Sequence, residues 1–394
     1  MSRKDKREEA KKHESEPKKK ITIKLPEIKG FSKKQIISSI LVVVFVVVML
    51  CVMNYTDIGF VLNKNITDED VTTVELIGSN NKIYSYYNEV LIADSSKLST
   101  YNKYGRKTWE LDMQGANDAK ITTSGKYLQV INSDKSTVYV FNDKYDTAQI
   151  RIDGKILYGT INSKGDSVIE YEASGNKTVL GIYDKNGKAK YNVKLSNNTI
   201  SQYVLSDNSS KLAYVEVNIN GISASSTVQL VDLNGKGGEA KVEQFALEEN
   251  SLIYELDFSG NNIVYRTDKD IVSINVSNKK KKVSSIEQDG IVSLDLDKNK
   301  YSYVEFENGK YFLGIKTIGG KDKKEIEINE LPKHFVYIKD KVYVCFQKEM
   351  HIYNNSRKEI KEYKSDMVIT KPVILGEGNN IAFLVSNKLI IYTI

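Results

Sequence analysis

The chain has 394 residues, a formal net charge of +6 and a pI near 8.8. The excess charge is confined to one end, because residues 1–34 hold 13 basic and 6 acidic residues while the remainder holds 44 and 45. A nucleic-acid-binding domain instead carries its basic residues as a patch on its folded surface. This distribution therefore argues against a nucleic-acid partner.

The first 35 residues are polar and contain almost no side chains that could form a core. Such a composition predicts a disordered tail. Its lysines cluster next to the following apolar run, and such clusters are attracted to anionic lipid headgroups. We expect these lysines either to contact the membrane surface or simply to set the topology of the chain. The membrane-surface candidates are Lys18, Lys19, Lys20, Lys33 and Lys34.

An uncharged stretch runs from Ile36 to Met53 and includes only two polar residues, Ser38 and Ser39. About 20 apolar residues cross a bilayer as a helix, and Asn54 and Tyr55 extend this run to the interface, where Tyr is favoured. A buried strand would be much shorter. The sequence therefore predicts a transmembrane helix over residues 36–54, with membrane lipid as its partner.

A cleaved signal peptide is the alternative to a retained signal-anchor. Signal peptides have a short basic start and a small-residue cleavage site, whereas here the leader has 35 residues and Cys51–Tyr55 offers no Ala-x-Ala pattern. Because basic residues favour the cytoplasmic side, we expect a single-pass cell-membrane protein with a cytoplasmic N-terminus. Residues 55–70 are then a linker, and residues 71–394 form an extracytoplasmic domain.

The outer region has one cysteine, Cys345, and the other cysteine, Cys51, lies in the predicted helix. The domain is therefore expected to fold without an internal disulfide. Lys, Asn, Ile and Tyr are abundant and Pro is scarce, which is common in low-GC bacteria. In such a cell the outer side would face the wall.

Residues 71–394 show short stretches with alternating apolar residues, separated by Asn, Asp, Gly and Ser, which is the pattern of strands and turns. These stretches form groups of four with a period near 40 residues, a signature of β-propeller blades. We predict an all-β fold with eight blades, seven being the alternative. The predicted blades cover residues 82–112, 118–153, 156–195, 200–246, 252–288, 291–329, 334–365 and 372–394.

The last predicted blade has only three strands, and the segment Val71–Ile77 belongs to no other blade. An N-terminal strand that completes the last blade would close the ring and remove exposed sheet edges. We therefore expect residues 71–77 to close the propeller. The face near this strand would be the one closer to the membrane, and the opposite face is where we expect a partner.

The turns agree with this organisation. Asn186-Gly187 lies between two predicted strands, and both residue types tolerate the positive φ of a hairpin turn. Asn102–Gly105 and Asp232–Gly235 occur at equivalent places in their repeats.

The segment VLIADSSKLSTYNKYGRKTWEL (90–111) resembles the PQQ-like repeat of quinoprotein-type propellers, which include the outer-membrane assembly lipoprotein class. Gly105, Lys107 and Trp109 match this repeat, and Gly187, Lys188 and Tyr191 match it more loosely. Residues 206–214 are similar to the repeat of periplasmic translocation-associated propellers. The whole layout resembles uncharacterised single-pass propeller proteins of clostridia. The resemblance implies a propeller fold; the single Trp, in an outer-strand position, implies no quinone cofactor.

The sequence nominates no catalytic, cofactor-binding or metal site. Of the three His, His334 begins the seventh predicted blade and His351 lies on its third strand, and two His without a third ligand make a poor zinc site. Asp184–Gly187 lacks the later ligands of a calcium loop. The HExxH, CxxC, GxSxG and phosphate-loop patterns do not occur.

The resulting functional prediction is a non-catalytic, membrane-tethered propeller that acts as a binding scaffold for a protein or a polymer at the bacterial cell envelope. The alternative is an envelope enzyme, either a hydrolase or quinoprotein-like, with its site in the propeller funnel. Convergent carboxylates with strongly perturbed pKa values around the funnel would favour the enzyme.

Overall fold

The computed structural model describes residues 71–394 except for short gaps at 79, 133–135, 196–198, 220–222, 235–240, 287–290, 321–324, 339–340, 355, 357, 377, 379 and 394. The predicted tail (1–35), transmembrane helix (36–54) and linker (55–70) lie outside these residues. Within the described part, no helix has the length and hydrophobicity needed to cross a bilayer. Residues 70–394 form one compact unit.

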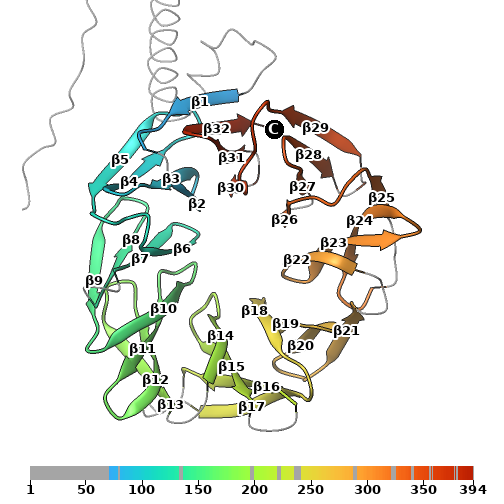
Figure 1. Cartoon of the computed structure of the whole chain (residues 1–394). Coiled ribbons are helices and arrows are strands. Elements are labelled where there is room, and N and C mark those ends of the chain that lie inside the picture. The colour runs from blue at the N-terminus through green and yellow to red at the C-terminus, as the bar shows by residue number, and fades with distance from the viewer. Residues whose placement is uncertain are drawn as a thin grey trace, which may run out of the picture. The chain divides into compact units, whose positions relative to one another are not determined.

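This unit is a ring of eight four-stranded antiparallel sheets, so the prediction of an eight-bladed β-propeller is confirmed (Figure 1). Strands follow one another from the propeller axis outward in each of the first seven blades. Blades 1 to 4 consist of β2 (Lys82–Tyr86), β3 (Glu89–Ala93), β4 (Lys97–Tyr101) and β5 (Lys107–Asp112); β6 (Lys120–Ser124), β7 (Tyr127–Asn132), β8 (Thr137–Phe141) and β9 (Thr147–Arg151); β10 (Lys155–Ile161), β11 (Ser167–Ala173), β12 (Asn176–Tyr183) and β13 (Ala189–Leu195); and β14 (Thr199–Leu205), β15 (Lys211–Asn218), β16 (Ser225–Asp232) and β17 (Lys241–Glu248).

Blades 5 to 7 repeat the same order, and blade 8 combines the two ends of the described chain. These blades consist of β18 (Ile253–Ser259), β19 (Asn262–Thr267), β20 (Asp270–Asn275) and β21 (Lys281–Ser285); β22 (Ile291–Asp297), β23 (Lys300–Glu307), β24 (Lys310–Thr317) and β25 (Glu325–Ile328); β26 (His334–Ile338), β27 (Lys341–Cys345), β28 (Glu349–Asn354) and β29 (Glu359–Lys364); and β30 (Val373–Leu375), β31 (Asn380–Val385), β32 (Lys388–Thr393) and β1 (Val71–Glu75).

The strand expected over residues 71–77 is β1, and it pairs antiparallel with β32 from Val71↔Tyr392 to Glu75↔Lys388. It is the outermost strand of blade 8, so the N-terminal and C-terminal strands share one sheet. This pairing leaves β32 with a partner on both sides. The edge that three C-terminal strands alone would expose is therefore covered.

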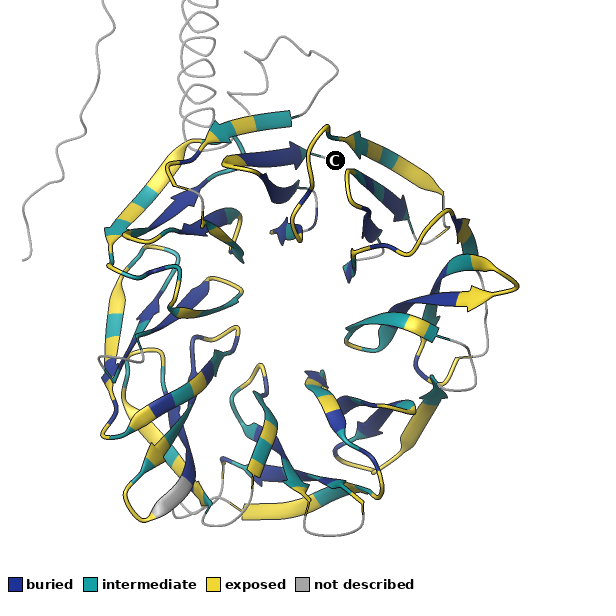
Figure 2. Cartoon of the chain, viewed as in Figure 1, coloured by how far each residue is buried: buried dark blue, intermediate teal, exposed yellow. Residues whose placement is uncertain are grey.

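The core lies between blades, where the two middle strands are the most buried of each sheet and the outermost strands consist mainly of exposed and partly buried residues (Figure 2). Val90, Leu128 and Ile381, from three different blades, are fully buried. Trp109 lies on the outermost strand β5, where it stacks on Tyr145 with ring centroids 4.7 Å apart and meets Phe141 edge-on. It joins blades 1 and 2, which explains its use in an outer strand.

The predicted turn at Asn186-Gly187 is present, but only Gly187 has a positive φ, of 82°. The Gly187 amide donates to the Asp184 carbonyl, and the Asp184 carboxylate accepts hydrogen bonds from the amides of Asn186 and Lys188. The aspartate side chain thus fixes the loop, and the glycine supplies the left-handed residue that follows it. Cys345, at the end of β27, is buried and free, and burial raises the pKa of its thiol to about 12.

The two ends of the propeller differ in their connections. We use the name bridging face for the end of the propeller at which each innermost strand begins. This face carries the segments that link successive blades, such as 113–119. It also carries the hairpins between the second and third strands of each blade, such as 94–96. The opposite end, the hairpin face, carries the other two hairpins of each blade. The chain enters the propeller at Val71 on the hairpin face, because β1 runs antiparallel to β32.

Candidate functional site

The innermost strands are of two kinds. In blades 3 to 6 each has seven residues, whereas in blades 7, 8, 1 and 2 each has only three to five. The four long strands also share a register shift near their start, which leaves one residue without a cross-strand partner. The short four pair without any shift. The unpaired residues are Leu157, Ser201, Tyr254 and Val292.

A β-bulge of this kind bends its strand and re-aims the side chains beside it, and bulges are frequent next to functional sites. Two of the four bulge residues, Tyr254 and Val292, expose about half of their surface (48% and 52%) although both are large and apolar. The bulges therefore present side chains to solvent on the bridging side of blades 4 to 6, whereas Leu157 in blade 3 is only partly exposed. We take this half of the molecule, the bulged half, as the candidate site.

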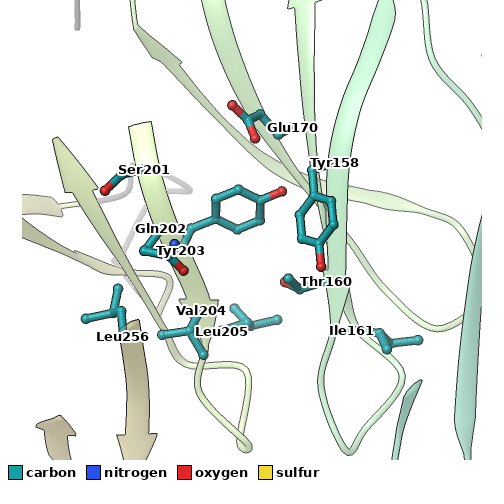
Figure 3. A pocket seen from close by; sticks show the side chains of 10 residues that line it. All are labelled: Tyr158, Thr160, Ile161, Glu170, Ser201, Gln202, Tyr203, Val204, Leu205 and Leu256. Atoms are coloured by element: carbon teal, nitrogen blue, oxygen red, sulfur yellow. The ribbon is translucent and has the colours of Figure 1, made fainter. Parts of the chain in front are cut away.

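A pocket of about 530 Å³ opens between the innermost strands β10 and β14 of the bulged half (Figure 3). Its volume falls within the range of small-molecule sites. The rings of Tyr158 and Tyr203 meet edge-to-face across it, with centroids 6.4 Å apart, and Glu170 lies beside them. Its wall is formed by Tyr158, Thr160, Ile161, Glu170, Ser201, Gln202, Tyr203, Val204, Leu205 and Leu256.

Glu170 is the charged group of this pocket. Burial raises its pKa, and the nearby Lys120 partly offsets the effect. Burial, reinforced by the negative charge of Glu170, also raises the pKa of Tyr203. Two aromatic rings beside one carboxylate suit a ligand with an apolar body and a cationic or hydroxyl-bearing end.

The pocket depends on close packing behind β10. A Cβ built on Gly159 would lie 2.8 Å from Gln129 Oε1 and from Ile131 Cδ1. Glycine at this position lets β10 approach blade 2, and the neighbouring residues Tyr158 and Thr160 line the pocket on the other face of the strand.

Carboxylates gather on the next two innermost strands. Glu255 and Asp257 are two residues apart on β18, and Asp295 and Asp297 are two residues apart on β22, so each pair shares one face of its strand. Burial, reinforced by the charges of Glu255 and Asp297, raises the pKa of Asp295 to about 6, although the Tyr337 amide donates a 3.0 Å hydrogen bond to its carboxylate.

The pKa values of Asp257 and Asp297 are raised as well. The protein atoms around Asp257 displace part of its hydration shell, and this raises the pKa of its carboxyl group. Part of the side chain still reaches solvent. Burial also raises the pKa of Asp297, against the opposing effect of Lys298 and Lys300. These convergent carboxylates are the feature that would favour an enzyme. Glu255 differs from these three aspartates because it forms an ion pair with Arg266, whose guanidinium lies 3.4 Å from its carboxylate.

The two histidines of the domain are where the sequence predicts them. His334 is the first residue of β26, and its pKa is lowered by burial and by Lys371 and Lys333. His351 lies on β28, the third strand of blade 7, on the face that also carries Glu349 and Glu362. Among the described residues, sequence reasoning missed these carboxylate neighbours of His351, as well as the bulges and the pocket. The candidate membrane-surface lysines lie outside the described residues.

Exposed apolar side chains are unevenly distributed between the two faces. Of the 14 large apolar residues that are exposed in the described part, nine lie at the bridging end of the propeller and three, Tyr87, Val242 and Ile360, lie at the hairpin end. Isolated exposed apolar residues are common, but their collection on one face marks an interaction surface. The nine are Ile77, Ile219, Leu247, Tyr254, Val292, Phe306, Leu331, Met367 and Val368.

Comparisons with known proteins agree with the fold. The crystal structure of BamB from Moraxella catarrhalis is similar to this chain with a TM-score of 0.53 and 11% identity, over 82% of this chain and 98% of BamB. The structure of apo AztD from Citrobacter koseri is similar with a TM-score of 0.51 and 9% identity, over 76% of this chain and 90% of AztD. At such identities the similarity shows the fold alone.

A search of curated protein sequences finds no match. A family model, described as a family of unknown function (DUF5711), matches residues 63–393, which include the closing strand and all eight blades. The chain therefore belongs to this family.

Proposed function

We propose that this protein is a non-catalytic, protein-binding scaffold of the bacterial cell envelope, tethered to the cell membrane by the predicted helix 36–54. The observation that carries the proposal is the uneven distribution of exposed apolar side chains, nine of which lie on the bridging face. Large apolar and aromatic anchors contribute most of the affinity in protein interfaces. A protein partner accounts for such side chains better than a polar wall polymer does.

The fold suits this role because the chain enters at Val71 on the hairpin face, which leaves the bridging face free of the covalent attachment. The extracytoplasmic orientation follows from the basic tail.

Affinity capture from native membranes tests this proposal. The full-length chain and a triple variant, Tyr254→Ser, Val292→Ser and Phe306→Ser, are compared with the matched control Tyr87→Ser, whose side chain is equally exposed (51%) on the other face. We expect a partner that the wild type and the control both retain and that the triple variant loses at least tenfold. A partner retained equally by all three proteins would contradict the proposal.

The carboxylates of β18 and β22 favour a second candidate function, a hydrolase that acts on wall material. Asp295, with a pKa raised to about 6, holds its proton up to about pH 6 and could donate it as a general acid in mildly acidic conditions. Release of soluble fragments from purified wall by the wild type, abolished in Asp295→Asn, would establish this function in place of the scaffold.

A further inference from the structure

A cluster of one histidine and three glutamates lies on the outer strands of blade 7, away from the bulged half. His351 on β28 pairs directly with Glu362 on β29, and Glu349 is two residues from His351, so these three side chains share one face of the sheet. Glu349 and Glu362 Oε atoms lie 3.3 Å and 3.8 Å from His351 Nε2, and the ligand atoms of the three residues all lie within 4.8 Å of one another.

The fourth member, Glu359, reaches the same face because of a register shift between β28 and β29. Glu359 and Glu362 are three residues apart, so in a regular strand they would point to opposite faces. The register shift opposite Ile352 and Tyr353 leaves Ile360 unpaired and turns Glu359 toward the histidine. Its carboxylate lies 3.3 Å from His351 Nδ1, on the ring edge opposite to Glu349 and Glu362.

The separations are long for charge-assisted hydrogen bonds, which are about 2.7–2.9 Å. The 3.3 Å between Nε2 and Glu349, a long hydrogen bond in this structure, also matches two ligands of one metal ion, because N and O ligands at about 2.0–2.2 Å from a tetrahedral centre lie about 3.3–3.5 Å apart. Glu362, at 3.8 Å, would join them after a small movement of its side chain. A carboxylate at the second ring nitrogen is the usual way in which a metal-bound histidine is oriented. The Tyr353 hydroxyl hydrogen-bonds to Glu359 and so supports this outer position.

Charge and enclosure favour a cation at this place. Lys364 pairs with Glu362 Oε1 at 2.9 Å and offsets the charge of one of the three carboxylates, which leaves two negative charges beside the imidazole. Because the same oxygen faces His351 Nε2, a bound metal ion would displace the ammonium group from it. The imidazole is only 15% exposed, and Phe346 packs edge-on against it. The carboxylates are 37–46% exposed, so solvent reaches the position between them and Nε2.

We infer that Glu349, His351 Nε2 and Glu362 bind a divalent transition-metal ion of the zinc type, with the Glu359 carboxylate placed beside Nδ1, a buried atom that makes no hydrogen bond within the described part of this structure. An imidazole ligand selects Zn²⁺ or Co²⁺ over Mg²⁺ and Ca²⁺, which prefer oxygen ligands only. Three protein ligands leave the remaining coordination positions to water.

Equilibrium dialysis of the full-length chain in detergent against Zn²⁺ tests this site. The expected result is one Zn²⁺ per chain, bound at least tenfold more weakly by His351→Gln and by the double variant Glu349→Gln, Glu362→Gln. The matched control His334→Gln should bind as the wild type does, because His334 lies on a different strand of the same blade. Circular dichroism establishes whether each variant is folded. If His351→Gln does not fold, the double variant still tests the site, because it keeps the histidine.

Nitrogen-15 spectra of the histidine rings provide a direct readout, since the chain has only three histidines. Zn²⁺ should shift Nε2 of His351 and leave His334 unchanged. The inference would be overturned if the wild type bound no Zn²⁺, if His351→Gln bound it equally well, or if the shifted ring belonged to His13 or His334.

Discussion

The two halves of the ring differ in the strand that lines the axis. Blades 7, 8, 1 and 2 have short innermost strands in regular register, and this regular half contains the closing pair of β1 and β32. Blades 3 to 6 have longer innermost strands, each with a bulge, and they carry the pocket and the carboxylates with raised pKa. Ring closure and the candidate site are thus placed in different blades, so the site can depart from regular geometry without opening the ring.

The largest expected effect tests the structural role of the regular half. Phe383 on β31 is fully buried and meets Tyr363 edge-on with centroids 5.1 Å apart. Phe383→Ala leaves a cavity in the closing blade and should lower the free energy of unfolding by about 3–5 kcal/mol. Tyr254→Ala, at an exposed bulge of the other half, should change it by less than about 0.5 kcal/mol.

Equilibrium unfolding of the full-length chain in guanidinium chloride measures both variants, with the midpoint reporting stability and the slope reporting the surface exposed. If Tyr254→Ala were as destabilising as Phe383→Ala, the bulged residues would serve the core, and the division between the halves would fail.

A smaller effect tests the cost of the carboxylates in the bulged half. The folded state raises the pKa of Asp295 to about 6, from an ordinary value of 3.8. The folded protein therefore binds the proton more tightly than the unfolded chain, and stability falls as the pH rises from about 4 to about 6. Asp295→Asn should remove the cost of ionising this buried carboxyl group and stabilise the protein by about 1–2 kcal/mol at pH 7. The Asn side-chain oxygen can still accept the hydrogen bond that the Tyr337 amide donates.

Urea unfolding at pH 4.5 and pH 7 measures the difference between Asp295→Asn and the wild type at each pH. An unchanged difference at the two pH values would show that Asp295 is ionised throughout this range, and the hydrolase alternative would lose its acid.

The fold could be predicted from the sequence because each blade repeats the same local pattern. Alternation of apolar residues defines the strands, and turn residues such as Asp184 and Gly187 mark their ends. Even the role of Val71–Glu75 follows from counting, since the last blade is one strand short. Where the sequence expected a positive φ at both Asn186 and Gly187, the Asp184 side chain allows a longer loop in which only Gly187 needs it.

The candidate site could not be predicted in the same way. A bulge adds one residue without a characteristic side chain, so Tyr254 and Val292 read as ordinary strand residues. The spacing of Glu359 and Glu362 places them on opposite faces of a regular strand, and only the unpaired Ile360 brings both to His351. The pocket requires strands from two blades, and no local pattern relates Tyr158 to Tyr203.

The most direct measurement of the central claim is site-specific photocrosslinking in native cells, with the probe at Tyr254 on the bridging face or at Tyr87 on the hairpin face. Both side chains are about half exposed, so they differ in face and not in accessibility. The scaffold account predicts a discrete crosslinked protein from position 254 and none from position 87. Equal crosslinking from both positions, or from neither, would contradict it.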